Sequence, residues 1–199
     1  MQDQWDQRFK EEGFAYGSQP NEYFKMEIDK LVPGRLLLIG EGEGRNAVYA
    51  AKTGWQVDAF DFSEAAKEKA LNFAAQNNVK INYSVQDLND FLPEAGQYDA
   101  AAIIYVHLDE QLRIEVNNKL IKALKPGGAL IMEVFDKDQM PYKSGGPKDL
   151  SLLYSLEDVV NDFADLDFVN LSKEIINLNE GKYHNGEAVV IRFTGIKVE

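Results

Sequence analysis

Short apolar runs alternate with stretches of helical periodicity through most of the chain, and this alternation limits the fold more than any other feature. The first run, Arg35–Ile39, is almost wholly apolar and leads through a glycine-rich turn into an amphipathic stretch. Continuous apolar runs are typical of strands that are buried on both faces of a parallel sheet. The pattern therefore predicts an α/β fold, with a mostly parallel sheet and helices on both of its faces.

The same pattern predicts where the parallel strands and their helices lie. Five strands are expected, at Arg35–Ile39, Gln56–Phe60, Val79–Val85, Tyr98–Val106 and Ala129–Phe135. Helices are expected over Glu43–Thr53, after an N-cap at Ser63 and after an N-cap at Asp109. The helix after Asp109 should stop at Lys125–Gly128 (KPGG), because proline and paired glycines do not continue a helix.

The last part of the chain departs from this rhythm. Ser155–Asp158 resembles a capping box and predicts a short helix. Two β-like runs follow, Phe168–Leu178 and Ala188–Ile196, with only a short polar loop between them. A connection this short cannot cross over a sheet, so the two runs should form an antiparallel hairpin. The result is a Rossmann-like sheet of seven strands, unlike the nicotinamide-binding version, which continues with parallel units.

Length and composition suit one domain. The chain has 199 residues, of which 45% are hydrophobic, and a single core usually stops growing beyond about 250 residues. We expect residues 1–34 to form an N-terminal helical cover and residues 35–199 to form the α/β core. This length is compatible with either a monomer or a homodimer.

Charge and residue usage exclude several classes of partner. The chain has 21 basic and 33 acidic residues, a net charge of −12, and no basic run, which disfavours nucleic acid. Its longest apolar stretches, such as Ala100–Val106, are far shorter than the ~20 residues that span a bilayer. It begins with the acidic segment Met1–Asp6, and it has no cysteine and no metal-ligand spacing. We expect a cytoplasmic protein, without metal, that acts on a small molecule.

Chemistry-bearing residues follow the first three predicted strands. The loop Gly40–Asn46 (GEGEGRN) follows the first strand, Asp61 follows the second, and Asp87 and Leu88 follow the third. In an open α/β sheet, ligands bind beyond the carboxyl ends of the strands. Glycines let the backbone approach a ligand closely, and an acid at the end of the second strand can accept the two hydroxyls of a ribose. The pattern predicts a nucleoside-binding site.

The loop also indicates which nucleoside it takes. The dinucleotide fingerprint has glycine at its sixth position, where this loop has Arg45, and no lysine follows as in a phosphate-binding loop. Glu41 and Glu43 would repel a pyrophosphate. In the alternative interpretation both side chains point to solvent, and the prediction that no phosphate binds here does not depend on that choice. S-adenosylmethionine (SAM) has no phosphate and carries an ammonium and a sulfonium, which acidic neighbours tolerate or favour.

Three segments resemble class I SAM-dependent methyltransferases: Leu36–Asn46 (LLLIGEGEGRN), Val57–Ser63 (VDAFDFS) and Leu124–Gly128 (LKPGG). Further pieces are similar to the tellurite-resistance-like and thiopurine-methyltransferase-like branch of that family. They are Trp5–Phe9, Tyr16-Gly17, Pro20-Asn21, Val106–Leu108, Gly145–Asp149 and Tyr183-His184.

The resemblance implies roles for the cofactor-binding residues, with SAM as methyl donor and S-adenosylhomocysteine as product. Gly40, Gly42 and Gly44 would line the methionine part, and Asp61 would hold the ribose. Phe62 would lie against the adenine, and Asp87 and Leu88 would contact the edge of the adenine. The same set includes Arg45, Asn46 and Tyr105. The family usually has an acid at position 38, where this chain has Leu38, so we expect Glu41 to contact the amino group of SAM instead.

The acceptor side is predicted from the remaining polar residues. Methyl transfer is an in-line displacement in which positioning supplies most of the catalysis, and a soft nucleophile such as a thiol, tellurite or selenite needs no base. For an oxygen or nitrogen acceptor, His107 is the candidate base, because an unperturbed histidine titrates near ~6.5. An alternative role for His107 is a backbone hydrogen bond in its loop. The expected substrate-side residues are Tyr16, Tyr142, Lys148, Tyr183 and His184.

Two other functions stay open at this stage. One is a protein with the SAM-binding fold that acts as a scaffold without catalysis, which the missing acid at Leu38 allows. The other is a nicotinamide-dependent oxidoreductase, which Arg45 and the C-terminal hairpin disfavour. Fold by itself does not decide between binding and catalysis.

Overall fold

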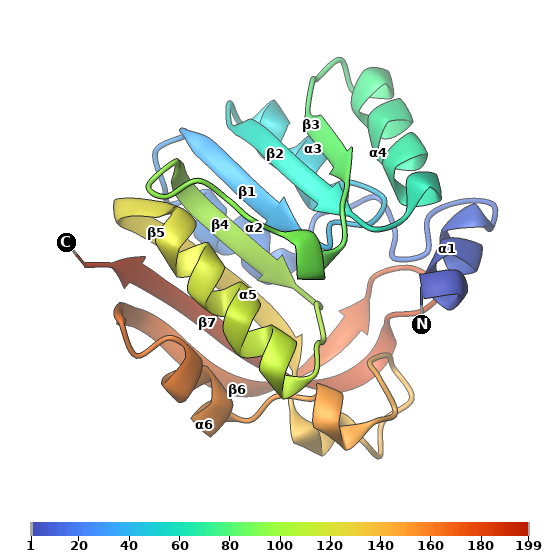
Figure 1. Cartoon of the computed structure of the whole chain (residues 1–199). Coiled ribbons are helices and arrows are strands. Elements are labelled where there is room, and N and C mark those ends of the chain that lie inside the picture. The colour runs from blue at the N-terminus through green and yellow to red at the C-terminus, as the bar shows by residue number, and fades with distance from the viewer. Residues whose placement is uncertain (1, 199) are drawn as a thin grey trace.

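The computed structural model describes residues 2–198 and consists of one seven-stranded sheet with helices on both faces (Figure 1). The strand order is β3-β2-β1-β4-β5-β7-β6; β1 to β5 run parallel, and β7 runs antiparallel to both of its neighbours. The strands are β1 Arg35–Ile39, β2 Gln56–Asp61, β3 Asn82–Val85, β4 Tyr98–Ile104, β5 Leu124–Phe135, β6 Leu166–Asn179 and β7 Asn185–Lys197. The predicted α/β sheet and its antiparallel hairpin are confirmed.

The helices divide between the two faces of the sheet. They are α1 Gln2–Lys10, α2 Glu22–Ile28, α3 Arg45–Lys52, α4 Glu64–Gln76, α5 Glu110–Ala123 and α6 Leu156–Asp162. α5 and α6 cover one face, in front of the sheet in Figure 1, while α2, α3 and α4 pack on the other. α1 packs on α4 at the end of the sheet where β1, β2 and β4 finish. Among the described residues, no helix combines the length and the apolar character needed to cross a bilayer.

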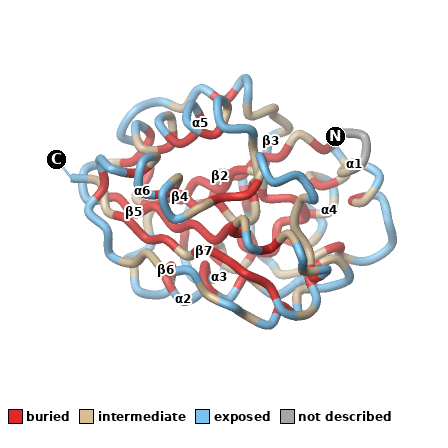
Figure 2. The backbone as a smooth tube through the Cα atoms, turned by 90° about the horizontal axis from the view of Figure 1, so that it is seen from below, coloured by how far each residue is buried: buried red, intermediate tan, exposed pale blue. Residues whose placement is uncertain are grey.

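The sheet is the centre of two apolar layers. Leu37 and Ile39 of β1 pack toward α5 and α6, whereas Leu36 and Leu38 pack toward α2 and α3. In Figure 2 the buried backbone accordingly runs through the strands, and the exposed backbone follows the loops and outer helix faces. A strand that is buried on both faces must be apolar at every position, which is why these strands read as continuous apolar runs.

The predicted N-caps are confirmed. The Ser63 side chain accepts a hydrogen bond from Ala66 N–H at 3.2 Å and so begins α4. Asp109 caps α5 by accepting from Leu112 N–H at 3.1 Å. Ser155 begins α6 with a capping box completed by the Asp158 side chain. These side chains satisfy backbone donors that the first turn of a helix leaves unpaired.

Several predicted boundaries shift, most clearly those of β5, β3 and α3. β5 starts at Leu124, because Tyr98 pairs with Leu124 and the register then shifts before Ala100 pairs with Ala129. The Pro-Gly-Gly segment therefore lies within an irregular strand and is not a loop. β3 begins only at Asn82, because Val79 N–H donates back to the Ala74 carbonyl at the end of α4. α3 begins at Arg45, after an N-cap glycine.

That N-cap glycine, Gly44, generates a stability prediction. Its φ is +85°, and a Cβ there would lie 2.7 Å from the Cβ of Ala70 on α4. Gly96 has a similar φ of +63° with nothing within 4 Å, so it serves as the matched control. Gly96→Ala should lower the free energy of unfolding by about 1 kcal/mol from backbone strain alone. Gly44→Ala should cost about 1–3 kcal/mol more, because it also forces α3 away from α4.

Urea unfolding of both variants measures the two losses. Equal losses would show that α3 and α4 accommodate the added methyl group, contrary to this packing.

Candidate active site

The loop Gly40–Gly44 joins β1 to α3 at the carboxyl edge of the sheet, beside the end of β2 (Figure 1). Glu41 N–H donates to the carbonyl oxygen of Phe60 at 3.1 Å, and Gly42 N–H donates to Oδ2 of Asp61 at 3.1 Å. The end of β2 therefore holds the shape of the loop. The three predicted parts of the nucleoside site, at the ends of β1, β2 and β3, do lie at one edge of the sheet.

Asp61 is buried between the loop and the start of α4. Its Oδ1 accepts from Ser63 N–H at 3.1 Å, and the residue is 5% exposed. Burial raises the pKa of Asp61 to about 6, outweighing the backbone hydrogen bonds from Ser63, Gly42 and Phe62, which lower it. An ionised carboxylate has about four acceptor positions, of which these contacts use up to three. Asp61 therefore has acceptor capacity left for hydroxyl groups, such as those of a ribose.

Glu41 caps helix α3. Its Oε1 accepts from the N–H groups of Asn46 and Ala47 at 2.9 and 2.8 Å, and its Oε2 accepts from Nδ2 of Asn46 at 3.2 Å. Gly44, the N-cap residue, offers no side chain for this task. Burial raises the pKa of Glu41 to about 7 despite these contacts. The carboxylate is thus committed to the helix N-terminus, and its geometry does not support the predicted contact to a SAM amino group. Leu38 lies in the core, 1% exposed.

Glu43 ties the loop to the N-terminal segment. Its Oε2 accepts from Ala15 N–H at 2.7 Å, and its Oε1 pairs with Nζ of Lys69 on α4 at 2.8 Å. The residue is 5% exposed. The alternative in which both loop glutamates point to solvent is therefore wrong, because each is buried and paired.

The predicted adenine-side residues lie at the ends of β2 and β3. Phe62, which follows Asp61, is partly buried, and Gln86 N–H donates to the Asp61 carbonyl at 3.0 Å. Asp87 begins a 3-10 turn over Leu88–Asp90 by accepting from Asn89 N–H at 2.9 Å. Leu88 is partly buried against the α5 side of the core. The edge thus carries one aromatic, one apolar and one acidic side chain where the adenine is expected.

An aromatic cover lies over the loop. Trp5 and Phe9 of α1 stack at 5.9 Å between ring centroids, and Trp5 also meets Tyr16 at 6.1 Å. Phe9 lies so close to Gly42 that a Cβ there would come within 3.3 Å of its ring. Tyr16 in turn contacts Tyr183 of the β6–β7 hairpin at 6.2 Å. The N-terminal segment and the hairpin therefore meet above the carboxyl edge.

Tyr105, directly after β4, has a strained backbone. Its φ is +56°, which a residue with a Cβ rarely adopts. Its hydroxyl donates to Oε1 of Glu133 at 2.6 Å, and its ring stacks on Phe135 at 4.6 Å. Such strain is found where the surroundings over-determine a residue, often at functional sites.

A buried polar network surrounds Tyr105. Glu133 of β5 is completely buried, and besides Tyr105 it binds Nδ2 of Asn21 at 2.6 Å and Nε of Arg192 at 2.7 Å. Nδ2 of Asn21 also donates to Oε1 of Glu180 at 3.1 Å. The members of this network are Asn21, Arg45, Tyr105, Glu133, Glu180, His184 and Arg192.

Four members of this network were not predicted as site residues from the sequence: Asn21, Glu133, Glu180 and Arg192. One signal could have found Glu133, namely a single acid inside the apolar run Ala129–Phe135. A buried charge requires partners, so this acid predicts polar side chains around it. Its partners lie far away in sequence, and no local pattern reveals them.

The geometry does not support His107 as a base. Its Nδ1 lies 2.9 Å from the carbonyl oxygen of Leu152, and its Nε2 accepts from Phe135 N–H at 3.4 Å. Burial lowers the pKa of His107 to about 4. Both ring nitrogens thus bind backbone groups, which agrees with the alternative role considered for this residue, and the neutral ring links β5 to the segment before α6.

The other predicted substrate-side residues divide into two groups. Tyr16, Tyr183 and His184 come together with Tyr105, since the rings of Tyr16 and Tyr105 lie 4.4 and 4.5 Å from that of His184. Lys148 is exposed, and its Nζ donates to the Tyr142 carbonyl at 2.5 Å. Among the described residues, no hydrogen bond, ion pair or ring contact joins Tyr142 or Lys148 to the aromatic group. Their loop does approach it, however, through Gly145, where a Cβ would lie 2.7 Å from the His184 ring.

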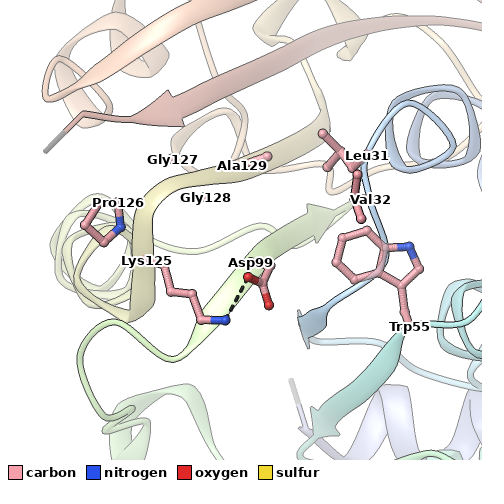
Figure 3. A pocket seen from close by; sticks show the side chains of 9 residues that line it. All are labelled: Leu31, Val32, Trp55, Asp99, Lys125, Pro126, Gly127, Gly128 and Ala129. Atoms are coloured by element: carbon pink, nitrogen blue, oxygen red, sulfur yellow. Dashed lines mark hydrogen bonds and ion pairs between the residues drawn. The ribbon is translucent and has the colours of Figure 1, made fainter.

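A surface cavity lies away from this site. Its volume is about 240 Å³, and Figure 3 shows it between Trp55, Leu31 and the turn before Ala129, next to the ion pair of Lys125 with Asp99 at 2.7 Å. These residues precede or begin β1, β2, β4 and β5. The cavity is therefore at the amino edge of the sheet, opposite the loop Gly40–Gly44.

Sequence comparisons agree with this geometry. Residues 36–128 match a family model described as a methyltransferase domain. The 2-heptyl-1-hydroxyquinolin-4(1H)-one methyltransferase of Mycobacteroides abscessus is 26% identical over 141 residues, which cover 69% of this chain and 62% of that protein. A ubiquinone biosynthesis O-methyltransferase of Rickettsia akari is 30% identical over 125 residues, covering 62% of this chain and 47% of that protein. The chain thus spans only about half to three-fifths of the length of these relatives.

Solved structures agree on the fold. TehB from Haemophilus influenzae superposes with a TM-score of 0.74 at 16% identity, over 89% of this chain and 62% of TehB. A SAM-dependent methyltransferase from Methanosarcina mazei superposes with a TM-score of 0.68 at 13% identity, over 90% of this chain and 99% of that one. The matches support the predicted enzyme class and SAM as its cofactor. By sequence over residues 36–128, and by fold over about nine-tenths of its length, the chain is similar to SAM-dependent methyltransferases.

Proposed function

We propose that this protein transfers a methyl group from SAM to a small-molecule acceptor. The proposal rests chiefly on the hydrogen bonds made by the backbone N–H groups of the loop. The N–H groups of Glu41, Gly42 and Gly44 donate to acceptors of the protein itself. At the start of α3, the N–H groups of Asn46 and Ala47 donate to the Glu41 carboxylate. A phosphate-binding loop needs such amides free and aimed at the anion. The edge therefore fits a nucleoside cofactor without phosphate, which argues against a nicotinamide dinucleotide.

The residues at the edge have separate tasks in this proposal. The backbone of Gly40–Gly44 borders the methionine part, with Arg45, Asn46 and Tyr105 around it. Asp61 accepts the ribose hydroxyls, and Phe62 with Asp87 and Leu88 encloses the adenine. When bound, SAM supplies an electrophilic methyl group on a sulfonium. The chain itself positions the acceptor in line with that group and excludes water through the aromatic cover.

The acceptor is proposed to bind between the cover and the hairpin, where Tyr16, Tyr105, Tyr183 and His184 meet. The resemblance in sequence favours a soft nucleophile such as a thiol, tellurite or selenite. The relatives are named for methylation in quinolone and ubiquinone chemistry, so both kinds of acceptor deserve trial. We further propose a place in the tellurite-resistance-like or thiopurine-methyltransferase-like branch, which the fold shared with TehB supports.

The acidic charge and the lack of cysteine support a cytoplasmic enzyme that acts on a small molecule and binds no nucleic acid or membrane. Its length and acidity are compatible with a monomer or with a homodimer.

Calorimetric titration of the folded chain tests this function. Wild type should bind SAM and S-adenosylhomocysteine and should not bind NADH. Asp61→Asn should weaken SAM binding by about tenfold or more, because a charge-assisted hydrogen bond contributes about 1.5–3 kcal/mol. Asp58→Asn is the matched control, since Asp58 lies on the same strand and pairs with Arg35 at 2.8 Å, away from the loop.

Equal affinities for SAM in the two variants would contradict the role of Asp61. SAM binding without turnover on any acceptor would favour the scaffold alternative.

The pKa of Asp61 predicts how SAM affinity depends on pH. Its folded-state pKa is raised to about 6, and ribose hydroxyls donate to the charged carboxylate, so binding requires loss of the proton below that pH. SAM affinity should therefore be full above pH 6 and fall by up to about tenfold per pH unit below it. Glu41 titrates near pH 7 as well, so Asp61→Asn is the reference. If the slope below pH 6 persists in Asp61→Asn, it arises from another group.

A further inference from the structure

His184 and Glu180 form a pair within one tight turn. Glu180 follows β6, His184 precedes β7, and Glu180 N–H donates to the His184 carbonyl at 2.8 Å, closing the turn. Nδ1 of His184 lies 3.2 Å from Oε2 of Glu180. The turn requires glycine at position 181, since a Cβ there would lie 2.5 Å from the backbone of Gly17. The hairpin and the N-terminal segment thus fix the pair together.

The contact with Glu180 determines which nitrogen of the neutral His184 ring carries the proton. Burial alone would raise the pKa of Glu180, but the hydrogen bond from His184 and the charge of Arg45 lower it to about 2. Glu180 is therefore a carboxylate, which can only accept, so the proton of a neutral His184 ring must be on Nδ1. Burial also lowers the pKa of His184, which keeps the ring neutral near pH 7. Its Nε2 is then a bare acceptor.

Nε2 of His184 is not used by the fold. In the described part of the chain it makes no hydrogen bond, whereas Nδ1 does. Among the described residues, Nε of Arg113 is the one buried side-chain nitrogen or oxygen without a well-aligned hydrogen bond, and it still forms an ion pair with Asp162 at 2.8 Å. Nε2 therefore keeps some contact with solvent, although His184 as a whole is only 5% exposed. His107 is the opposite case, with both nitrogens bound to backbone.

The imidazole lies between two loops: its Nδ1 side meets Glu180 and, through it, Arg45, while Nε2 faces Gly145, where a Cβ would lie 3.2 Å from it. Arg45, the residue after the loop, pairs with the same Oε2 of Glu180 at 3.1 Å. The imidazole is enclosed by the rings of Tyr16 at 4.4 Å, Tyr105 at 4.5 Å and Phe135 at 5.3 Å. A histidine that is oriented by a carboxylate and keeps its second nitrogen unprotonated can act as a general base toward a bound hydroxyl group, and the aromatic rings around it limit its contact with water.

We propose that His184 is the general base of this enzyme, oriented by Glu180 as a positioning residue, and that the acceptor is an aromatic hydroxyl. The inference rests on the proposed function and narrows its acceptor class. Nε2 takes the proton of the hydroxyl while the oxygen forms its bond to the methyl carbon. The carbon–sulfur bond breaks, its electron pair stays on sulfur, and the proton passes from Nε2 to water after the products leave.

The charged groups that face the ring are Glu180 on the hairpin, Arg45 on α3 and Arg8 on α1. Tyr16 and Tyr105, whose rings contact the imidazole, are the neighbouring residues that can titrate. Glu180 raises the pKa of His184, and both arginines lower it. Removing the Glu180 charge should therefore shift the acid limb of kcat/KM to lower pH, in addition to lowering kcat through loss of the Nδ1–H tautomer.

Two acceptor probes separate a base from a structural residue. The hydroxyls of catechol are protonated near neutral pH, whereas 4-nitrothiophenol is already a thiolate and needs no base. With the full chain and SAM, His184→Gln should lower kcat for catechol about 100-fold or more. It should leave the Kd for SAM nearly unchanged and should lower kcat for thiol methylation far less than kcat for catechol. Loss of both reactions to the same degree, or of neither, overturns the proposal.

The imidazole nitrogen chemical shifts provide a readout that needs no turnover. The chain has only two histidines, so His107 serves as the internal reference. Near neutral pH, wild-type His184 should show a protonated Nδ1 and a bare Nε2, and Glu180→Gln should change the signals of His184 while leaving those of His107. A His184 that carries its proton on Nε2 overturns the proposal.

The outcomes for wild type separate the two levels of the argument. A chain that binds SAM and methylates the thiol but not catechol overturns the hydroxyl acceptor and keeps the proposed function. A chain that binds SAM and methylates neither probe overturns both. A folded chain that does not bind SAM overturns the proposed function before the base is considered.

Discussion

The buried carboxylate of Glu133 is the interaction on which the arrangement of the site depends. It lies in the middle of a sheet whose core is otherwise apolar, where an unpaired charge would cost several kcal/mol. Its partners come from three parts of the chain: Asn21 before α2, Tyr105 after β4 and Arg192 on β7. Satisfying this one charge therefore brings together the N-terminal segment, the central strands and the hairpin.

Local signals were enough to predict the frame of this fold, but not its polar interior. β1 is an apolar run, and the caps at Ser63 and Asp109 are set within a few residues, so both follow from short-range physics. The start of β5 does not, because the pairing of Tyr98 with Leu124 overrides the helix-stopping sequence next to it. In the site, the spacing of the glycine loop and Asp61 predicted one edge correctly.

The roles of Glu41 and Glu43 could not be read in the same way. A carboxylate in a loop can bind a ligand, cap a helix or pair with a lysine, and only tertiary contacts decide which. Here Glu41 satisfies the first turn of α3, while Glu43 meets Lys69 and the Ala15 amide, 28 residues away in sequence. Both carboxylates of the loop therefore maintain its shape, and Asp61 is the acid at this edge that keeps acceptor capacity for a ligand.

The two histidines differ in the hydrogen bonds of their ring nitrogens, and this difference determines what each can do. His107 lies closer in sequence to the expected methyl position, yet backbone groups occupy both of its nitrogens, so it can only hold strands together. His184 lies in a hairpin turn, far from the cofactor loop in sequence, and is joined to that loop through Glu180 and Arg45. A histidine base needs one nitrogen held in place by a partner and the other free to accept a proton. His184 of the hairpin meets this requirement, whereas His107 after β4 does not.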